Sequence, residues 1–363
     1  MTRQDVLAAV AAVEEPLLHR SLGELGLVKG VDVSGDHVRV QVAVPASRYP
    51  LKDELREAVA EAAGRQHDGA VEISLVPLDE HEEADLRRQL QPADAPSPLQ
   101  DTASRTRVIA VASGKGGVGK SSVTVNLAIQ LSKMGKRTAV IDADVWGFSI
   151  PRMLGVEYPP TAIDHLIIPP VAYGVACVSI GFFVDEDQPV IWRGPMLHKA
   201  LEQFLTDVYW GDADYCLIDM PPGTGDVSLS MAQYLPRAEV VVVTTPQPAA
   251  QRVAQRAGAM ARKVNLSVLG VVENMSWFTA DDGHRYELFG RGGGEELAAK
   301  LGVPLLGQIP LEPALREGGD DGRPISVDFP EAETSQAFAR IAQAIDELGP
   351  RRRRRPELTV RPA

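Results

Sequence analysis

The stretch SGKGGVGKSS, residues 113–122, combines glycines, two lysines and hydroxyl side chains in a pattern suited to phosphate chemistry. It fits G-x-x-x-x-G-K-[ST], in which the glycines let backbone N–H groups curl around the phosphates of a nucleotide. Lys120 is expected to pair with the β- and γ-phosphates, and the Ser121 hydroxyl is expected to coordinate Mg²⁺. The predicted nucleotide-binding residues of this loop are Gly114, Lys115, Gly116, Gly117, Val118, Gly119, Lys120, Ser121 and Ser122.

Three aspartates follow apolar runs that are typical of buried strands. Asp142 and Asp144 end the run VIDAD, and Asp219 ends the run YCLID. The carboxyl ends of strands in an open α/β sheet face the ligand crevice, so all three carboxylates should lie near the metal and the terminal phosphate. We interpret Asp219 as a ligand of Mg²⁺, Asp142 as the partner of a metal-bound water, and Asp144 as the residue that orients the attacking water. An aspartate at such a place can instead cap the segment that follows it.

Two further features concern the base and the switching of the site. Asn274 ends the run VLGVVEN, and its amide offers a donor and an acceptor complementary to the N6 and N7 edge of adenine. The corresponding region holds no NKxD-like guanine signature, which favours ATP over GTP. The loop PPGTG, residues 221–225, places a stiff diproline beside two glycines, as suits a segment that changes shape with the γ-phosphate.

Buried strands that alternate with helices must position these groups. Continuous apolar runs separated by helical stretches predict a mostly parallel sheet covered by helices on both faces. This is the α/β architecture of a P-loop NTPase, and we assign it to residues 106–349. The predicted strands are 108–113, 138–144, 175–181, 215–220, 240–245, 268–275 and 304–310.

The remaining residues divide into three parts. Residues 1–80 predict a small α+β domain, with helices near 2–14 and 51–64 and strands near 27–33, 37–44 and 70–76. Residues 81–105 are acidic and rich in proline, serine and alanine, which predicts a flexible linker that can begin with a short helix. Residues 350–363 include five consecutive arginines, Arg351–Arg355, and are interpreted as a disordered basic tail.

The composition limits the partners of the chain. A net charge of −12 disfavours nonspecific binding to nucleic acid or to an anionic membrane. No apolar run reaches the roughly eighteen residues of a membrane span, and the N-terminus lacks the pattern of a cleaved secretory signal. We therefore expect a cytoplasmic protein with no nucleic-acid and no membrane partner. Only Cys177 and Cys216 occur, which excludes a disulfide framework and a four-cysteine metal site within one chain.

The motifs together resemble a known family. In chain order, SGKGGVGKSS, VIDADVWGFSIP, WRGPM, DMPPGTGD, TTPQ and ENMSWF are similar to the Mrp/ApbC family of ATP-binding iron–sulfur cluster carriers, relatives of MinD and ParA. The stretches SLGELGLVKGVDV and YPLKDELREAV resemble the iron–sulfur assembly domain often fused ahead of this ATPase. The resemblance implies a homodimeric ATPase whose clients are iron–sulfur apoproteins or assembly factors. It also implies that Lys115 reaches the nucleotide of the other subunit, so Lys115, Lys120 and Asp144 are assigned catalytic roles.

The chain departs from this family at the expected cluster ligands. Family members usually carry CxxC shortly after the ENMS segment, whereas this chain has Asp281, Asp282 and His284 there. Because iron–sulfur clusters are held by thiolates, four-thiolate ligation at this place is excluded. Asp-Asp-Gly is more typical of a turn than of a metal site, and a cysteine within an apolar strand is more typical of a buried thiol. The cluster ligands stay unassigned, and Tyr49 stands where the small domain often has a further cysteine.

Two functions compete. The first is a homodimeric Mg-ATPase that assists iron–sulfur protein maturation, either by carrying a cluster through unusual ligands or as a conformational chaperone for a partner that supplies the thiolates. The second is a MinD- or ParA-like ATPase that positions cell components. That function would need an amphipathic membrane helix or a basic DNA-binding surface, and neither the tail RRRRRPELTVRPA nor the overall acidity favours one. A nitrogenase-type reductase fails on the cysteine count.

Overall fold

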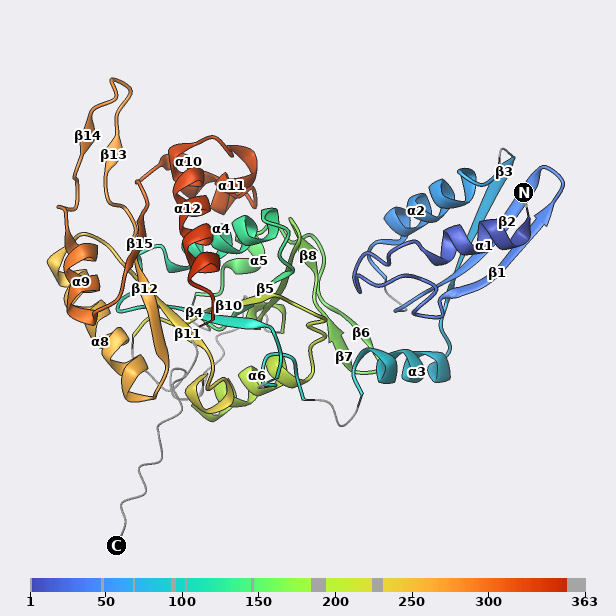
Figure 1. The fold of residues 1–363 in the computed structure, drawn as a ribbon, viewed down its shortest axis with the longest axis horizontal. Coiled ribbons are helices and arrows are strands. Elements are labelled where there is room, and N and C mark those ends of the chain that lie inside the picture. The colour runs from blue at the N-terminus through green and yellow to red at the C-terminus, as the bar shows by residue number, and fades with distance from the viewer. Residues whose placement is uncertain are drawn as a thin grey trace, which may run out of the picture.

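The computed structural model describes residues 2–350 except 47–48, 68, 93–95, 102, 145–146, 184–193 and 224–230. Figure 1 shows a small N-terminal domain beside a larger α/β domain. The arginine run Arg351–Arg355 of the predicted tail lies outside the described residues, and so do Thr224 and Gly225 of the diproline loop. Among the helices of the described part, none combines the length and the apolar composition that a membrane span requires.

The small domain packs two helices against a three-stranded sheet. Along β2 the alternation of HVRVQVAV buries Val38, Val40 and Val42 and exposes the residues between them. β2 pairs antiparallel with β1 and parallel with β3. The bounds are α1 (Arg3–Ala11), β1 (Val28–Ser34), β2 (His37–Val44), α2 (Lys52–Gly64) and β3 (Ala70–Pro77). This is the α+β unit that the sequence predicts.

The larger domain is built on a sheet whose eight described strands lie in the order β15-β12-β11-β4-β10-β5-β9-β8. Neighbouring strands are parallel except for β8 and β9 at one edge of the sheet. Strand β4 lies between β10 and β11, so the segments that follow these three strands meet at the same edge. The bounds are β4 (Arg107–Ser113), β5 (Thr138–Asp142), β8 (Val171–Ala172), β9 (Val175–Ser179), β10 (Tyr215–Asp219), β11 (Glu239–Thr244), β12 (Ser267–Glu273) and β15 (Leu305–Gln308).

Helices cover both faces of this sheet (Figure 1). Alternate residues of β4 point to opposite faces: Val108 and Ala110 belong to the core with α6, α8 and α9, and Ile109 and Val111 to the core with α4 and α12. The short 3₁₀ helix η1 (Ile180–Phe182) follows β9. The α-helix bounds are α4 (Lys120–Lys133), α5 (Ile150–Met153), α6 (Gly194–Thr206), α8 (Pro248–Lys263), α9 (Gly293–Leu301), α10 (Pro313–Asp320), α11 (Ile325–Asp328) and α12 (Glu333–Leu348).

The segment predicted as a linker contains the helix α3 (Glu80–Leu90). Leu86 of this helix is buried in the core of the small domain, whereas Leu99 is buried in a core of the larger domain. A hairpin of the larger domain, β6 (Thr161–Ile163) and β7 (Leu166–Ile168), also contributes side chains to the core of the small domain. The described part of the linker is therefore packed at both ends, although its composition is polar.

A second short hairpin, β13 (Phe278–Thr279) and β14 (Arg285–Tyr286), projects from the larger domain (Figure 1). All seven strands predicted for this domain are present in the structure. The two hairpins were not predicted, because strands of two or three residues are too short to show the alternation that identifies a strand.

Candidate nucleotide site

The loop between β4 and α4 lies at the carboxyl edge of the sheet and carries the phosphate-binding pattern. Gly117 and Gly119 have φ angles of 77° and 78°, a left-handed backbone that residues with a Cβ rarely adopt. A Cβ at Gly114 would lie 2.3 Å from backbone atoms of Val253 and Ala254 in α8. The backbone path and the close approach of α8 therefore both require glycine, and they determine how the loop enters α4.

Lys120 and Asp219 form a buried ion pair at the start of α4. Lys120 Nζ lies 2.6 Å from Asp219 Oδ2, and the two side chains are 6% and 0% exposed. The same carboxylate accepts hydrogen bonds from the hydroxyls of Ser121 at 2.6 Å and Thr124 at 2.8 Å. The structure thus brings together the predicted lysine, hydroxyl and metal-holding carboxylate. Thr124 was not predicted, although its place one helical turn after Lys120 is a signal that identifies it.

Asp144 and Asp142 lie next to this pair in different environments. Asp144 lines the pocket, with Oδ2 at 3.6 Å from Lys120 Nζ. Asp142 is fully buried, and burial together with the charge of Asp219 raises its pKa to about 7. The donors to its carboxylate are the N–H groups of Asp144, Ser149 and Ile150 and the hydroxyl of Ser179. Asp142 therefore caps the segment that enters α5, which is the alternative role that the sequence analysis left open. Its contact with a metal-bound water stays a prediction.

Asn274 follows β12 and reaches into the phosphate loop. Its Nδ2 donates to the carbonyl of Val118 at 2.9 Å, and a Cβ at Gly119 would lie 2.2 Å from this nitrogen. Within the described residues, the buried Oδ1 of Asn274 has no hydrogen-bond partner. The loop uses one of the two N–H groups of this amide, and the group without a partner among the described residues is the acceptor Oδ1. This narrows the expected contact with adenine from the N6 and N7 edge to the 6-amino group.

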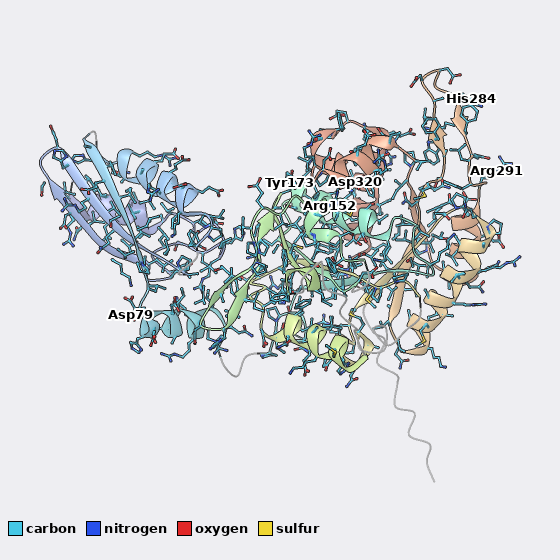
Figure 2. All side chains as sticks on the ribbon, turned by 180° about the vertical axis from the view of Figure 1, so that it is seen from behind. Asp79, Arg152, Tyr173, His284, Arg291 and Asp320 are labelled. Atoms are coloured by element: carbon cyan, nitrogen blue, oxygen red, sulfur yellow. The ribbon has the colours of Figure 1, made fainter. Side chains whose placement is uncertain are left out.

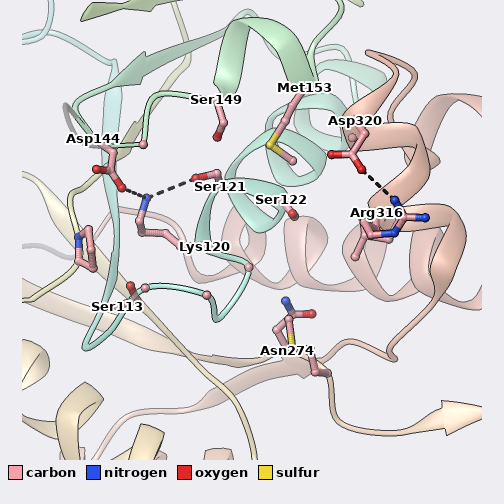
Figure 3. A pocket seen from close by; sticks show the side chains of 18 of the residues that line it. Ser113, Lys120, Ser121, Ser122, Asp144, Ser149, Met153, Asn274, Arg316 and Asp320 are labelled. Carbon is pink, nitrogen blue, oxygen red and sulfur yellow. Dashed lines mark hydrogen bonds and ion pairs between the residues drawn. The ribbon is translucent and has the colours of Figure 1, made fainter. Parts of the chain in front are cut away.

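The phosphate loop with Lys120 and Ser121, together with Asp144 and Asn274, lines one side of a pocket of about 630 Å³, which Figure 3 shows from close by. The opposite wall comes from α5, from α10 and from the loop after β15. There Arg316 and Asp320 form an ion pair at 2.9 Å, beside Met153. The other residues of this wall are Ser149, Arg152, Pro310, Leu311, Glu312 and Leu315. None of them was predicted as a site residue. Ser149 lies in the motif VIDADVWGFSIP, and the others belong to segments without a local motif and reach the pocket only through the fold.

Lys115, the first lysine of the loop, lines the same pocket but turns toward a different element. Its Nζ donates to Oε1 of Gln247 at 3.3 Å, where α8 begins. Among the described residues it forms no ion pair, in contrast to Lys120. The structure therefore places a second cation at the pocket, and the reach of Lys115 to another subunit stays a prediction.

The cysteines and the second hairpin bear on the cluster ligands. Cys177 on β9 and Cys216 on β10 are fully buried, and burial raises the pKa of both thiols. In the hairpin, Asp282 accepts a hydrogen bond from the N–H of His284 at 2.9 Å, which is the predicted turn. Figure 2 shows His284 on this hairpin, away from Arg152 and Asp320 at the pocket. Across the described residues, no group of three potential metal ligands is arranged to hold an ion.

The fold and the site together define a class of protein. A glycine-rich loop joins the central strand of a parallel sheet to a helix, and carboxylates stand at the ends of the neighbouring strands. This arrangement is that of a P-loop NTPase, here preceded by a small α+β domain.

Comparisons with known proteins identify the family. Residues 104–346 match the family model described as NUBPL iron-transfer P-loop NTPase, and residues 3–75 match that of an iron-sulfur cluster assembly protein. An iron-sulfur cluster carrier protein from Mycobacterium leprae is 46% identical over 360 residues, which cover 96% of this chain and 93% of that protein. The chain belongs to this family of P-loop iron–sulfur cluster carrier proteins, as the resemblance of its motifs predicts.

Solved structures share the fold. A nucleotide-binding protein from Archaeoglobus fulgidus, in complex with ADP, is 36% identical with a TM-score of 0.55, over 64% of this chain and 93% of that chain. The septum site-determining protein MinD from Pyrococcus horikoshii, in complex with Mg-ADP, is 26% identical with a TM-score of 0.51, over 67% of this chain and 97% of that chain. These likenesses confirm the predicted P-loop NTPase architecture.

Proposed function

We propose that this protein is a homodimeric Mg-ATPase that assists the maturation of iron–sulfur proteins. The observation that carries the proposal is the buried Lys120–Asp219 pair, with the Ser121 hydroxyl beside it, at a pocket that Lys120 and Ser121 line and that is large enough for a nucleotide. An ammonium, a hydroxyl and a carboxylate in contact are the groups that Mg²⁺ and nucleotide phosphates require. The iron–sulfur role is supported by relatives along nearly the whole chain that are named iron-sulfur cluster carrier proteins.

The residues present fit Mg-ATP. Ser121 and Asp219 would hold the metal, which supplies positive charge to the β- and γ-phosphate oxygens when bound. Lys120 lies 2.6 Å from Asp219, so its ammonium can exchange a carboxylate for phosphate oxygens while staying at the start of α4. The N-terminus of α4 adds positive potential. Asp144, within 3.6 Å of the same ammonium, is the acceptor that we assign to the attacking water.

The identity of the base follows from one atom. Oδ1 of Asn274 is a buried acceptor without a partner in the described chain. An acceptor is matched by the 6-amino group of adenine and repelled by the 6-oxo group of guanine. Leaving such an atom unpaired costs about 1–3 kcal/mol, so the preference for ATP has a sufficient energetic basis.

The dimer is proposed from Lys115. This side chain lines the pocket and donates to the neutral amide of Gln247, so releasing it breaks no ion pair with a residue that the structure describes. A lysine that reaches the nucleotide of the other subunit would stabilise charge as the γ-phosphate leaves, as an arginine finger does. We propose that ATP hydrolysis opens and closes this dimer, and that the chain acts in the cytoplasm, where ATP is available and its two free thiols stay reduced.

The proposed cargo chemistry places the cluster ligands on the client. Both thiols of this chain are buried inside the sheet, and their raised pKa disfavours the thiolate that binds iron. We therefore propose a conformational chaperone that receives iron–sulfur apoproteins or assembly factors, rather than a carrier with four thiolates of its own. The spatial-positioning alternative has no comparable support, since residues 3–75 match an iron-sulfur cluster assembly protein.

ATP turnover of the full-length chain tests the ATPase. Wild-type protein should hydrolyse ATP only with Mg²⁺, and its specific activity should rise with protein concentration as dimers form. Lys115→Ala should lower turnover by about 100-fold or more and change ATP affinity by less than about threefold. Lys263→Ala, an exposed lysine at the end of α8, is the control. A wild-type protein without turnover contradicts the ATPase, and a fully active Lys115→Ala variant contradicts the intersubunit lysine.

Anaerobic reconstitution tests the cargo. Wild-type protein alone should retain no stable iron and sulfide, whereas a mixture with an apoprotein that supplies cysteines should mature faster in the presence of ATP. Stable visible absorbance in the wild type that disappears in Cys177→Ser or Cys216→Ser would show that the buried thiols are ligands after all.

A further inference from the structure

Glu273, the residue before Asn274, carries a carboxylate that the nucleotide chemistry above does not use. It ends β12, and its side chain is completely buried. All of its hydrogen-bond partners among the described residues are neutral donors. A buried carboxylate without a cation costs several kcal/mol unless hydrogen bonds compensate, so this position calls for an explanation.

The neutral donors come from three separate parts of the fold. Oε1 accepts the Ser276 hydroxyl at 2.9 Å and the Gln308 amide at 2.7 Å, and Oε2 accepts the N–H of Gly294. Gly294 is in the first turn of α9, whose N-cap residue Gly292 has no side chain to accept that N–H. One carboxylate therefore joins the end of β12 to β15 and to the N-terminus of α9.

These contacts hold the turn of residues 273–276 in one shape. The N–H of Asn274 donates to the carbonyl of Thr244 at 2.8 Å, and the N–H of Ser276 donates to the carbonyl of Ile309 at 2.9 Å. Between them, Met275 has a φ of 57°, a left-handed backbone that is uncommon for methionine. Because the backbone on both sides of Asn274 is anchored, its side chain enters the phosphate loop along one direction.

We propose that Glu273 is a positioning residue that sets the nucleobase preference of the site through Asn274. The inference rests on the proposed function, because it assigns adenine to this pocket. With the turn held in place, Nδ2 of Asn274 donates to the carbonyl of Val118, and Oδ1 is left as an acceptor without a partner among the described residues, available to the 6-amino group of a base. A reversed amide would present Nδ2 to the base, where it would donate to a 6-oxo group instead. The carbonyl of Val118 accepts only from Nδ2, and Glu273, by holding the turn, keeps the amide within reach of that carbonyl without touching the nucleotide.

Binding of Mg-ATP and Mg-ITP to the full-length chain, measured by calorimetry, tests this role. The two nucleotides carry a 6-amino and a 6-oxo group on otherwise matching purines. Wild-type protein should prefer ATP by about tenfold or more. Glu273→Gln, which keeps the volume but replaces one acceptor oxygen with a donor, should reduce the preference to within about threefold, and Asn274→Ala should abolish it.

A second buried carboxylate provides the matched control. Glu239 begins β11, far along the sheet from the pocket, and is 4% exposed. Glu239→Gln should lower stability but keep the wild-type ratio of ATP to ITP affinity. A purely structural role of Glu273 would weaken both nucleotides equally and leave the ratio unchanged, and that result would overturn the inference.

Milder variants cover the case in which Glu273→Gln does not fold. Ser276→Ala and Gln308→Ala each remove one donor to the carboxylate, and each should lower the ratio by about threefold. Wild-type ratios in both would overturn the inference. A wild-type protein that binds neither nucleotide would overturn the proposed function as well. A wild-type preference for ATP that stays the same in all the variants of Glu273 and its donors would overturn the inference alone.

Discussion

Two buried ion pairs lie near opposite ends of the central strand β4. Lys120–Asp219 stands at the carboxyl edge of the sheet, and Arg107–Glu239 stands at the amino edge. Each pair has an N···O distance of 2.6 Å, and no side chain in either is more than 6% exposed. By charge, distance and burial alone the two pairs are equivalent.

Their surroundings differ. Asp219 accepts two hydroxyl hydrogen bonds besides the lysine, and its pair adjoins a pocket. Glu239 has an Oε1 without a partner in the described chain, and Arg107 donates to the carbonyl of Ile345. The Lys120–Asp219 pair can exchange its contacts for contacts with a ligand. The Arg107–Glu239 pair instead joins the amino ends of β4 and β11 to α12. A buried charge therefore indicates a functional site only where other polar groups and an accessible cavity accompany it.

The largest expected effect separates the two pairs by activity. Lys120→Met should lower ATP turnover by about 100-fold or more, because the phosphates lose their buried cation. It should cost less stability than the loss of Arg107, since Asp219 keeps the hydroxyls of Ser121 and Thr124. Steady-state turnover of the purified variant, with circular dichroism to confirm folding, measures this. Turnover within a few-fold of wild type would remove the functional distinction between the pairs.

The second prediction concerns stability at the amino edge. Arg107→Met should destabilise the larger domain by about 3–5 kcal/mol, because Glu239 would keep no cation and the carboxylate would stay buried. The turnover of the molecules that remain folded should not change. Urea unfolding followed by tryptophan fluorescence measures the stability of this domain, as all four tryptophans lie within it. A loss below about 1 kcal/mol would show that water reaches Glu239.

The third prediction uses Asp142, a buried carboxylate that forms no ion pair with any residue that the structure describes. Its pKa is raised by burial and by Asp219 to about 7, above the ordinary value of 3.8. The folded chain therefore holds a proton that the unfolded chain releases, and the contribution to stability is full below about pH 4 and is lost as the pH rises to about 7. The unfolding free energy of wild type, relative to Asp142→Asn, should fall by up to about 4 kcal/mol over this window.

Urea titrations at several pH values, on both chains, measure that difference. Groups that titrate in both chains cancel in the comparison. A difference that is constant from pH 4 to pH 7 would show that the four hydrogen-bond donors to Asp142 keep it ionised throughout.

Much of the fold could be predicted because its signals are local. The apolar runs that became β4, β5 and β10 are continuous, and the glycines of residues 114–119 directly precede a helix. Asp219 and Ser121 were assigned to one site because strand ends in a parallel sheet meet at one edge. Arg316 and the wall of α10 were missed, since nothing in their local sequence marks them, whereas Thr124 was missed although it lies one helical turn after Lys120.

The sequence by itself determined the phosphate loop, the order of strands and helices, and the family, because each depends on residue types within a short window. Only the tertiary structure decided what neighbouring groups do to one another. In the folded chain the Asn274 amide nitrogen donates to the carbonyl of Val118, and the Asp142 carboxylate accepts the N–H of Ile150 at the start of α5. The thiols of both cysteines are buried inside the sheet. A hydrogen bond across the fold uses up a donor or an acceptor, and that allocation depends on contacts between residues far apart in the chain.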